Sequence, residues 1–176
     1  LTNRVMGVVY GNKGAHASAV RCFESSLAMA REIGDREAIA KAEGNLAIIY
    51  DLEGRTEESE KASKNCLEYF LDVGDNIGAA RTANNLGVLN LSRDNLQVAG
   101  EYFEKTIAAS RACKDQDLLG TALVNAGYCY ARTGDAARAL SYSDEGMRIF
   151  RELCNQNMIA LAYRNYGTIE ARNARF

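Results

Sequence analysis

Four asparagines lie forty residues apart along the chain, and this spacing constrains the possible fold more than any other feature of the sequence. They are Asn45, Asn85, Asn125 and Asn165. A fixed period of this length over most of a sequence is the signature of stacked structural units, each of which packs mainly on its neighbours. The spacing therefore predicts a repeat architecture.

Further columns of similar residues align when the sequence is shifted by forty residues. The small-residue column contains Gly7, Ala47, Gly87, Gly127 and Gly167. The tyrosine column contains Tyr10, Tyr50 and Tyr130, with Asn90 as the exception. A turn column contains Gly14, Gly54 and Gly134, with Asp94 in the remaining place. The columns predict a single domain over residues 1–176, with units at approximately 1–36, 37–76, 77–116 and 117–156 and a partial fifth unit at 157–176.

Each full unit is predicted to form two helices. Between Gly78 and Ser92 the apolar residues recur at close to a helical period, and turn-forming residues follow at 93–95. A second amphipathic stretch runs from Val98 to Ala108, and the pattern starts again after residue 117. No alternation typical of strands competes with this pattern. The partial fifth unit is expected to be a further helix near residues 157–172.

Small residues are expected where the two helices of a unit approach each other. We predict that Gly87 and Gly127 face Ala99 and Ala139, because large side chains there would force the helices apart. The Gly34–Asp35 pair is expected to end one helix in the left-handed conformation and to cap the next.

Composition limits the classes of function. The chain is 47% hydrophobic and 25% charged, with a formal net charge of -2, which is ordinary for a globular protein. Near-neutral charge argues against general binding of nucleic acid, and no apolar run approaches the roughly 20 residues that span a membrane. No targeting segment is visible, but the first residue is Leu1, so this absence carries little weight. We expect a cytoplasmic protein.

Cysteine and histidine usage argues against a metal site. Five cysteines occur without a Cys-x-x-Cys pair, and His16 is the single histidine. The thiols are expected to be reduced structural residues, and neither a metal nor a cofactor is expected. No arrangement of nucleophile and base and no phosphate-binding glycine loop is visible, so the sequence predicts a non-enzyme.

The repeated pattern resembles the tetratricopeptide repeat. Leu86–Gly87, then Tyr130, Gly134, Ala139 and Tyr142, stand at the characteristic places of that family. In the first unit Gly7, Tyr10, Gly14, Ala19 and Phe23 stand at the same places. The chain departs from the family in lacking the proline after the second helix, and its period is forty rather than the usual thirty-four. Such longer units look like the Pins-type repeats of spindle-orientation adaptors, and kinesin light chains and several signalling adaptors also use extended repeats.

The resemblance implies an all-α, right-handed α-solenoid (superhelix) of antiparallel helix hairpins. It also implies that the first helices line a concave surface that binds a partner peptide. Carried over by position, the peptide-binding residues are expected to be Arg4, Lys41, Asn45, Ile48, Arg81, Asn84, Asn85, Val88, Asn125, Tyr128, Arg132, Arg164 and Asn165. Val8 and Asp51 are expected on the same face.

The asparagine column has two interpretations of equal weight. The amides could bind the backbone of a peptide, since an amide both donates and accepts hydrogen bonds. They could instead bond neighbouring helices and set the curvature of the array. The basic residues of the predicted face favour an acidic partner, because arginine binds carboxylates with two hydrogen bonds. Arg4, Asn45 and Arg81 match three positions of the family's carboxylate clamp, whereas Val8 and Asn85 depart at two others.

Three functions were compared on this basis. The favoured one is a scaffold or adaptor that binds a partner protein or peptide. The second is a structural segment of a longer or self-associating solenoid, with the apolar Met158, Ile159, Leu161, Ala162 and Ile169 of the last helix left uncovered. An enzyme or an RNA-binding solenoid is the weakest, because no catalytic group and no sustained basic, aromatic stripe occurs. No membrane partner is expected.

Overall fold

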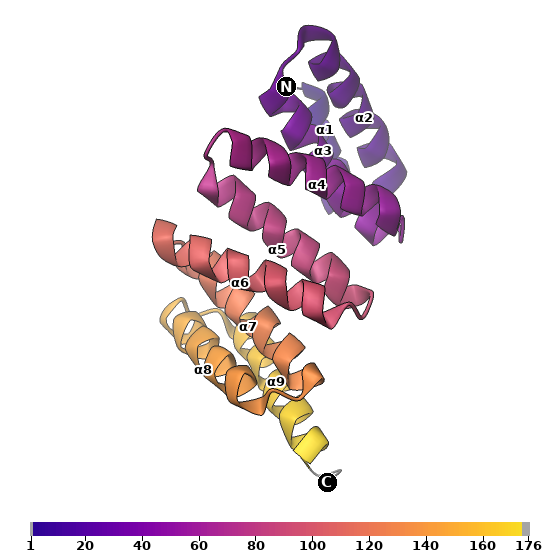
Figure 1. The fold of residues 1–176 in the computed structure, drawn as a ribbon. Coiled ribbons are helices and arrows are strands. Elements are labelled where there is room, and N and C mark those ends of the chain that lie inside the picture. Colours follow the sequence, from indigo (N-terminus) through magenta and orange to yellow (C-terminus); the bar gives the residue numbers. More distant parts are fainter. Residues whose placement is uncertain (1, 174–176) are drawn as a thin grey trace. The chain divides into compact units, whose positions relative to one another are not determined.

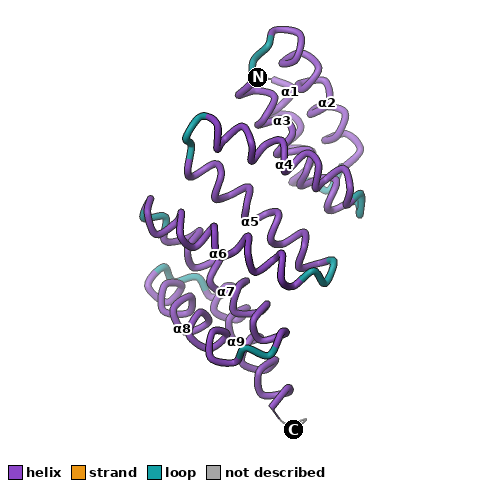
Figure 2. The backbone as a smooth tube through the Cα atoms, in the orientation of Figure 1, coloured by secondary structure: helices purple, strands orange, loops and turns teal. Residues whose placement is uncertain are grey.

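Over residues 2–173, which are the residues described, the computed structural model of the chain consists of nine α-helices and contains no strand (Figures 1 and 2). The all-α class predicted from the sequence is confirmed. The helices are α1 (Thr2–Asn12), α2 (His16–Ile33), α3 (Arg36–Leu52), α4 (Thr56–Asp72), α5 (Asn76–Ser92), α6 (Leu96–Cys113), α7 (Gln116–Thr133), α8 (Ala136–Glu152) and α9 (Gln156–Asn173). The last of these is the helix expected near residues 157–172.

The chain divides into two compact units, Leu1–Asn85 and Leu86–Phe176, which are described separately. In the first unit α1 packs on α2, α2 on α3, and α3 on α4. In the second unit α6 packs on α7, α7 on α8, and α8 on α9. First helices of successive pairs also touch, α1 with α3 and α7 with α9. The helix-hairpin repeat is therefore confirmed, while a single domain over residues 1–176 stays a prediction.

The turns between hairpins have the capping chemistry that the glycine–aspartate pair predicts. Gly34 ends α2 with φ +70°, and the Asp35 carboxylate accepts a hydrogen bond of 3.0 Å from the Ala38 amide at the start of α3. This satisfies one of the amides that a helix start leaves without a partner. At the equivalent helix ends, Lys114 and Cys154 adopt φ of +59° and +55° without being glycine.

Glycines allow close contact between the two helices of a hairpin. A Cβ on Gly127 would lie 2.6 Å from the Ser143 Oγ and 3.2 Å from the Ala139 carbonyl oxygen, so the predicted contact with Ala139 is confirmed. A Cβ on Gly87 would instead lie 2.5 Å from the Phe103 ring. The nearest neighbour of Gly87 is therefore Phe103, and the contact with Ala99 stays a prediction. The ring of Phe103 occupies the space beside the glycine.

The hydrophobic cores lie between the helices of each unit. The core of the first unit contains Ala19, Val20, Phe23, Leu27, Ala42, Leu46 and Ile49, and Tyr10 and Tyr50 pack against it. A core of the second unit contains Phe103, Ile107, Leu119, Leu123 and Ile149, with Tyr130 against it. These tyrosines therefore have the packing role that their repeated spacing favours. Among the described residues, no helix is long and apolar enough to cross a membrane.

The last helix is covered more fully than the sequence suggests. Ala162 and Ile169 are buried, and Met158, Ile159 and Leu161 are partly buried against the core formed by α7 and α8. The expectation that these five residues form an uncovered apolar surface is thus wrong for Ala162 and Ile169. The reason is that α9 packs on both helices of the preceding hairpin.

Candidate functional site

In the first unit, the predicted binding residues come from three first helices. Arg4 lies on α1, Lys41, Asn45 and Ile48 lie on α3, and Arg81, Asn84 and Asn85 lie on α5. Arg4, Asn45 and Asn84 are half-buried and the other four are exposed. The side-chain oxygen of Asn84 is buried and accepts no hydrogen bond from the described residues. These helices therefore carry an accessible surface of amides, cations and one large aliphatic side chain.

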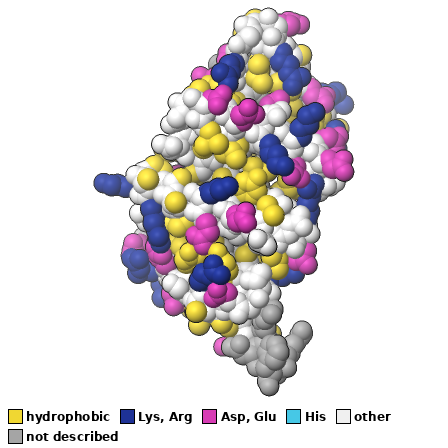
Figure 3. All heavy atoms as spheres, viewed as in Figure 1, with side chains coloured by type: hydrophobic (Ala, Val, Ile, Leu, Met, Phe, Trp, Pro, Cys, Tyr) yellow, Lys and Arg dark blue, Asp and Glu magenta, His cyan; other side chains and the backbone are white. Residues whose placement is uncertain are grey.

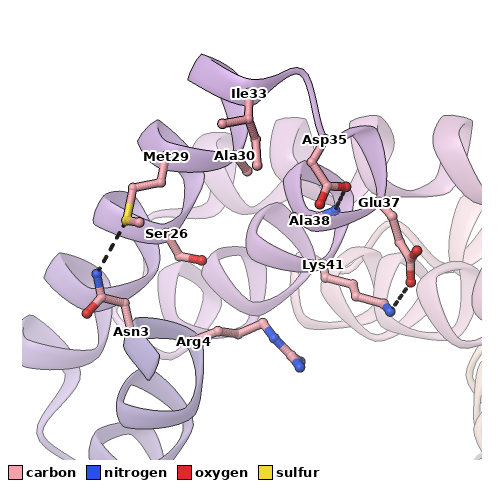
Figure 4. Close-up of a pocket in the computed structure, with 10 residues that line it drawn as sticks. All are labelled: Asn3, Arg4, Ser26, Met29, Ala30, Ile33, Asp35, Glu37, Ala38 and Lys41. Carbon is pink, nitrogen blue, oxygen red and sulfur yellow. Dashed lines mark hydrogen bonds and ion pairs between the residues drawn. The ribbon is translucent and has the colours of Figure 1, made fainter. Parts of the chain in front are cut away.

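A pocket opens beside this surface, between α1, α2 and α3 (Figure 4). It has a volume of about 490 Å³. Its lining residues are Asn3, Arg4, Ser26, Met29, Ala30, Ile33, Asp35, Glu37, Ala38 and Lys41. The pocket combines apolar walls with charged side chains, which is the usual composition of a ligand-binding concavity.

The charges that line this pocket are compensated with one exception. Lys41 forms an ion pair with Glu37, and the Asp35 carboxylate caps the start of α3. Arg4 forms no ion pair within the part of the chain that the structure describes. In Figure 4 its guanidinium extends from α1 toward the side of the pocket that Glu37 and Lys41 form. An uncompensated cation at the edge of an apolar pocket favours an anionic ligand.

The wall of the pocket formed by the second helix was missed by sequence reasoning. Met29 and Ile33 lie on α2 and are 57% and 78% exposed, although both are large and apolar. The family pattern assigns binding to first helices, so it does not point to α2. The signal that could have found them is a pair of large apolar residues, four apart, in the last turns of an amphipathic helix.

In the second unit, the predicted residues of α7 and α9 stack on one another. The Arg164 guanidinium lies 4.0 Å from the centre of the Tyr128 ring, and the Arg132 guanidinium lies 5.8 Å from it. Arg132 also forms an ion pair of 2.6 Å with Asp94, in the turn before α6. The two arginines of this cluster therefore interact with the ring from different helices, and Arg132 is partly neutralised. Val88, on α5, is exposed.

The asparagine column does not form a uniform surface. Asn165 is 0% exposed, and its Nδ2 donates hydrogen bonds of 2.9 Å to the Val124 carbonyl and 3.0 Å to the Ser143 Oγ. Asn125 is also buried. At Asn165 the structure thus supports the second interpretation, in which the amide bonds neighbouring helices. Asn45 and Asn85 stay accessible and stay candidates for peptide binding.

Another polar cluster joins three helices of the second unit. The hydroxyls of Tyr130 and Tyr142 donate to the Glu104 carboxylate, at 2.7 Å and 2.9 Å, and Arg138 lies over the Tyr130 ring. Burial, together with this carboxylate, raises the pKa of Tyr130 above its ordinary value. The bonds link α6, α7 and α8, so the cluster has a structural role.

The remaining surface is of mixed charge. On the face shown in Figure 3, basic and acidic side chains are interspersed with apolar ones. Among the described residues, no group of three or more histidine, cysteine, aspartate or glutamate side chains could hold a metal ion. The buried thiols are protonated at neutral pH, because burial raises the pKa of Cys66 and raises that of Cys129 to about 11.

Together, the hairpins and their first-helix surfaces define a helical repeat protein. A family model for the tetratricopeptide repeat matches residues 1–72 and 39–112. The chain belongs to the tetratricopeptide repeat family. The family predicted from the sequence is confirmed, and the Pins-like subtype stays a prediction.

Solved structures of similar fold include proteins of several kinds. BtubC (BKLC) from P. vanneervenii is 25% identical, with a TM-score of 0.81 over 87% of this chain and 63% of BtubC. Aspartyl phosphate phosphatase F from Bacillus subtilis is 20% identical, with a TM-score of 0.78 over 92% of this chain and 42% of the phosphatase. A Rap conjugation gene regulator of the plasmid pLS20, solved with the Phr* peptide, is 16% identical, with a TM-score of 0.78 over 96% of this chain and 46% of the regulator.

The extent of these matches limits what they show. The chain spans less than two thirds of each of the three proteins. At such identities the phosphatase and the regulator show the fold alone, and neither the enzyme's activity nor the regulator's ligand transfers with it. No protein of curated function matches the sequence.

Proposed function

We propose that the chain is a protein-interaction module, a scaffold or adaptor that binds a partner peptide on the first-helix surfaces. The observation that carries this proposal is the open pocket of the first unit, which lies between α1, α2 and α3 and is lined by Arg4 and Lys41 of the two first helices. The regulator solved with the Phr* peptide supports the proposal, because it places a peptide complex on the same fold.

The energetics suit recognition of an extended or helical segment. The first helices hold their side chains on regular backbone, so the surface loses little conformational entropy on binding. Ile48 offers exposed apolar area beside the accessible amide of Asn45. Apolar contact would supply affinity, while the amide would satisfy backbone groups of the peptide. An acidic segment is favoured, because Arg4 lacks a counter-charge among the described residues.

Selection from a displayed library of random peptides, followed by fluorescence anisotropy, would test the proposal. The double variant Arg4→Glu, Asn45→Ala should lower the affinity for the selected peptides by about tenfold or more, since it removes one charge-assisted and one neutral hydrogen bond. Arg21→Glu is the matched control, because Arg21 is an exposed arginine of the same unit on the second helix α2, where it contacts Ser18. Peptides that bind the double variant as tightly as the wild type would count against the site.

A second candidate function, self-association of the array, is favoured by the first helix. Met6 and Val9 on α1 are 40% and 39% exposed, whereas the equivalent Leu46 and Ile49 on α3 are 2% and 5% exposed. In α3 this face is covered by the preceding hairpin. The face of α1 thus has the composition of an internal interface without a cover among the described residues.

The other end shows the same feature. A Cβ on Gly7 or Gly127 would lie 2.6 Å from a second helix, whereas a Cβ on Gly167 would meet nothing within 4 Å. We infer that the faces of α1 and α9 take further helices of this type, from a second copy or a longer array. Light scattering over a concentration series would test self-association. The wild type should show a rising mass that Val9→Glu abolishes, and a constant monomer mass would refute it.

A further inference from the structure

The lining of the first unit's pocket includes a small residue from each of two helices. Ala30 on α2 and Ala38 on α3 both line the pocket. Forty residues later the equivalent pair is Phe70 and Gly78, and in the last hairpin Phe150 takes the place of Ala30. The chain therefore has a phenyl ring at this place in the second and fourth hairpins, the buried Ser110 in the third, and the open pocket beside Ala30 in the first.

Phe70 and Phe150 show how an aromatic ring packs at this position of a hairpin. In the first unit the Phe70 ring lies so close to α5 that a Cβ on Gly78 would be 2.5 Å from it. In the second unit Phe150 is fully buried and packs with Val124, Met147 and Ala162. Both rings lie where a second helix meets the next first helix. The opening beside Ala30 is bounded in the same way by α2 and α3, with Met29 and Ile33 as its exposed apolar wall.

The open place also carries a charge that the filled places lack. The residues equivalent to Arg4 are Gly44 beside Phe70 and Val124 beside Phe150. Because Glu37 pairs with Lys41 and Asp35 caps α3, neither acid of the pocket is available to Arg4 without losing its own partner. Arg4 is thus placed to bind one carboxylate at the edge of the opening (Figure 4).

We propose that this pocket binds an aromatic side chain of a partner peptide together with the carboxylate of a neighbouring aspartate or glutamate. The ring lies in the opening between α2 and α3, against the apolar wall of Met29 and Ile33. The carboxylate pairs with Arg4. The proposal rests on the peptide-binding function and specifies its ligand. The proposal commits to an acidic side chain, and probe peptides with blocked ends exclude a chain terminus as the source of the carboxylate.

Methyl NMR would test the proposal directly, because Met29 lines the pocket and Met147 is buried in the other unit. The probes are short Gly/Ser peptides with both ends blocked that contain Phe–Asp, Phe–Asn or Ala–Asp. Titration with Phe–Asp should shift the Met29 methyl signal and leave Met147 unchanged. Phe–Asn and Ala–Asp should each bind about tenfold more weakly, which is the loss of one charge-assisted bond or of one buried ring. A Phe–Asn peptide that bound only with a free carboxyl terminus would overturn the assignment to an acidic side chain.

Two variants separate the parts of the proposal. Ala30→Phe closes the pocket with the residue that equivalent hairpins hold and should abolish the Met29 shift. Arg4→Gln keeps the pocket and should reduce Phe–Asp binding to the level of Phe–Asn, so it decides the question even if the first variant fails to fold. Phe–Asp binding that keeps its wild-type affinity in either variant, with the protein folded, would overturn the proposal. If library-selected peptides bind without shifting the Met29 methyl signal, only the assignment of the ligand to this pocket is refuted. If no peptide binds at all, the proposed peptide-binding function is refuted as well.

Discussion

One glycine column predicts opposite effects of the same substitution at two positions. Gly87 and Gly167 both lie inside first helices of the second unit, eighty residues apart. Replacing a glycine by alanine in a helix interior gains about 0.5–1 kcal/mol, because the unfolded chain loses flexibility. The gain applies equally to both positions, so any difference between them reports the space around the new Cβ.

The surroundings of the two glycines decide whether the substitution to alanine stabilises or destabilises the protein. At Gly87 the Cβ would lie 2.5 Å from Cε1, 2.8 Å from Cδ1 and 2.9 Å from Cζ of Phe103, which is fully buried and cannot rotate away. Overpacking of this kind costs about 1–3 kcal/mol, so Gly87→Ala should be destabilised by up to about 2 kcal/mol. At Gly167 nothing lies within 4 Å, so Gly167→Ala should be stabilised by about 0.5–1 kcal/mol.

Urea unfolding followed by circular dichroism would measure both changes. The midpoint should fall for Gly87→Ala and rise for Gly167→Ala, with the slope unchanged, because neither variant alters the surface exposed on unfolding. Amide hydrogen exchange in α9 would report a local gain at Gly167 if the end of the array opens on its own. A Gly87→Ala protein as stable as the wild type would refute the packing argument. A destabilised Gly167→Ala protein would show that a helix covers α9 in solution.

Three further outcomes are expected. Asn165→Ala should lower stability by about 1–3 kcal/mol in urea unfolding, because it removes the amide that bonds Ser143 and a buried carbonyl. Lys114→Gly should raise stability by about 0.5–1 kcal/mol, since φ at this residue is +59°. The pKa of Tyr166 is raised from 10.0 to about 12 by burial and by its bond to Asp144. Its contribution to stability is therefore complete below pH 10.0 and is lost as pH rises toward about 12, so Tyr166→Phe should flatten the fall of the urea midpoint in this window.

Each of these outcomes has a control on the same chain. Asn85→Ala alters an exposed amide of the same column and should change stability by no more than about 0.5 kcal/mol. A Cys154→Gly protein should gain stability as Lys114→Gly does, because Cys154 also has a positive φ. Equal losses at Asn85 and Asn165 would contradict the assignment of one amide to the surface and the other to the interior. An alkaline transition unchanged in Tyr166→Phe would contradict the role given to that hydroxyl.

The period of the sequence was enough to predict the fold, because the residues of one column occupy the same packing position in successive hairpins. Glycine at position 127 and its neighbour Ala139 could be paired from the pattern alone. The approach of Phe103 to Gly87 could not be predicted, since it depends on how a ring turns against the helix. A column indicates which positions meet, but the side chain that fills the contact is decided by local shape.

The binding surface was less predictable, because exposure varies within a column. Asn45 and Asn165 have the same place in their helices, yet one is accessible and the other is buried under the hydrogen bonds of its own amide. Met29 and Ile33 were missed because they lie on a second helix. Arg132 was assigned correctly to a first helix, but its ion pair with Asp94 depends on a turn whose geometry is not visible in the sequence.

Departures from a column are as informative as the column itself. The asparagine column is interrupted in the first unit by Val5, which is exposed on α1. At Asn165 both hydrogen bonds of the amide reach the preceding hairpin, one to α7 and one to α8. No hairpin precedes α1 among the described residues, so an asparagine at position 5 would find neither acceptor there. A valine at that place is instead suited to apolar contact with a covering helix, which links this gap in the column to the end face formed by Met6 and Val9.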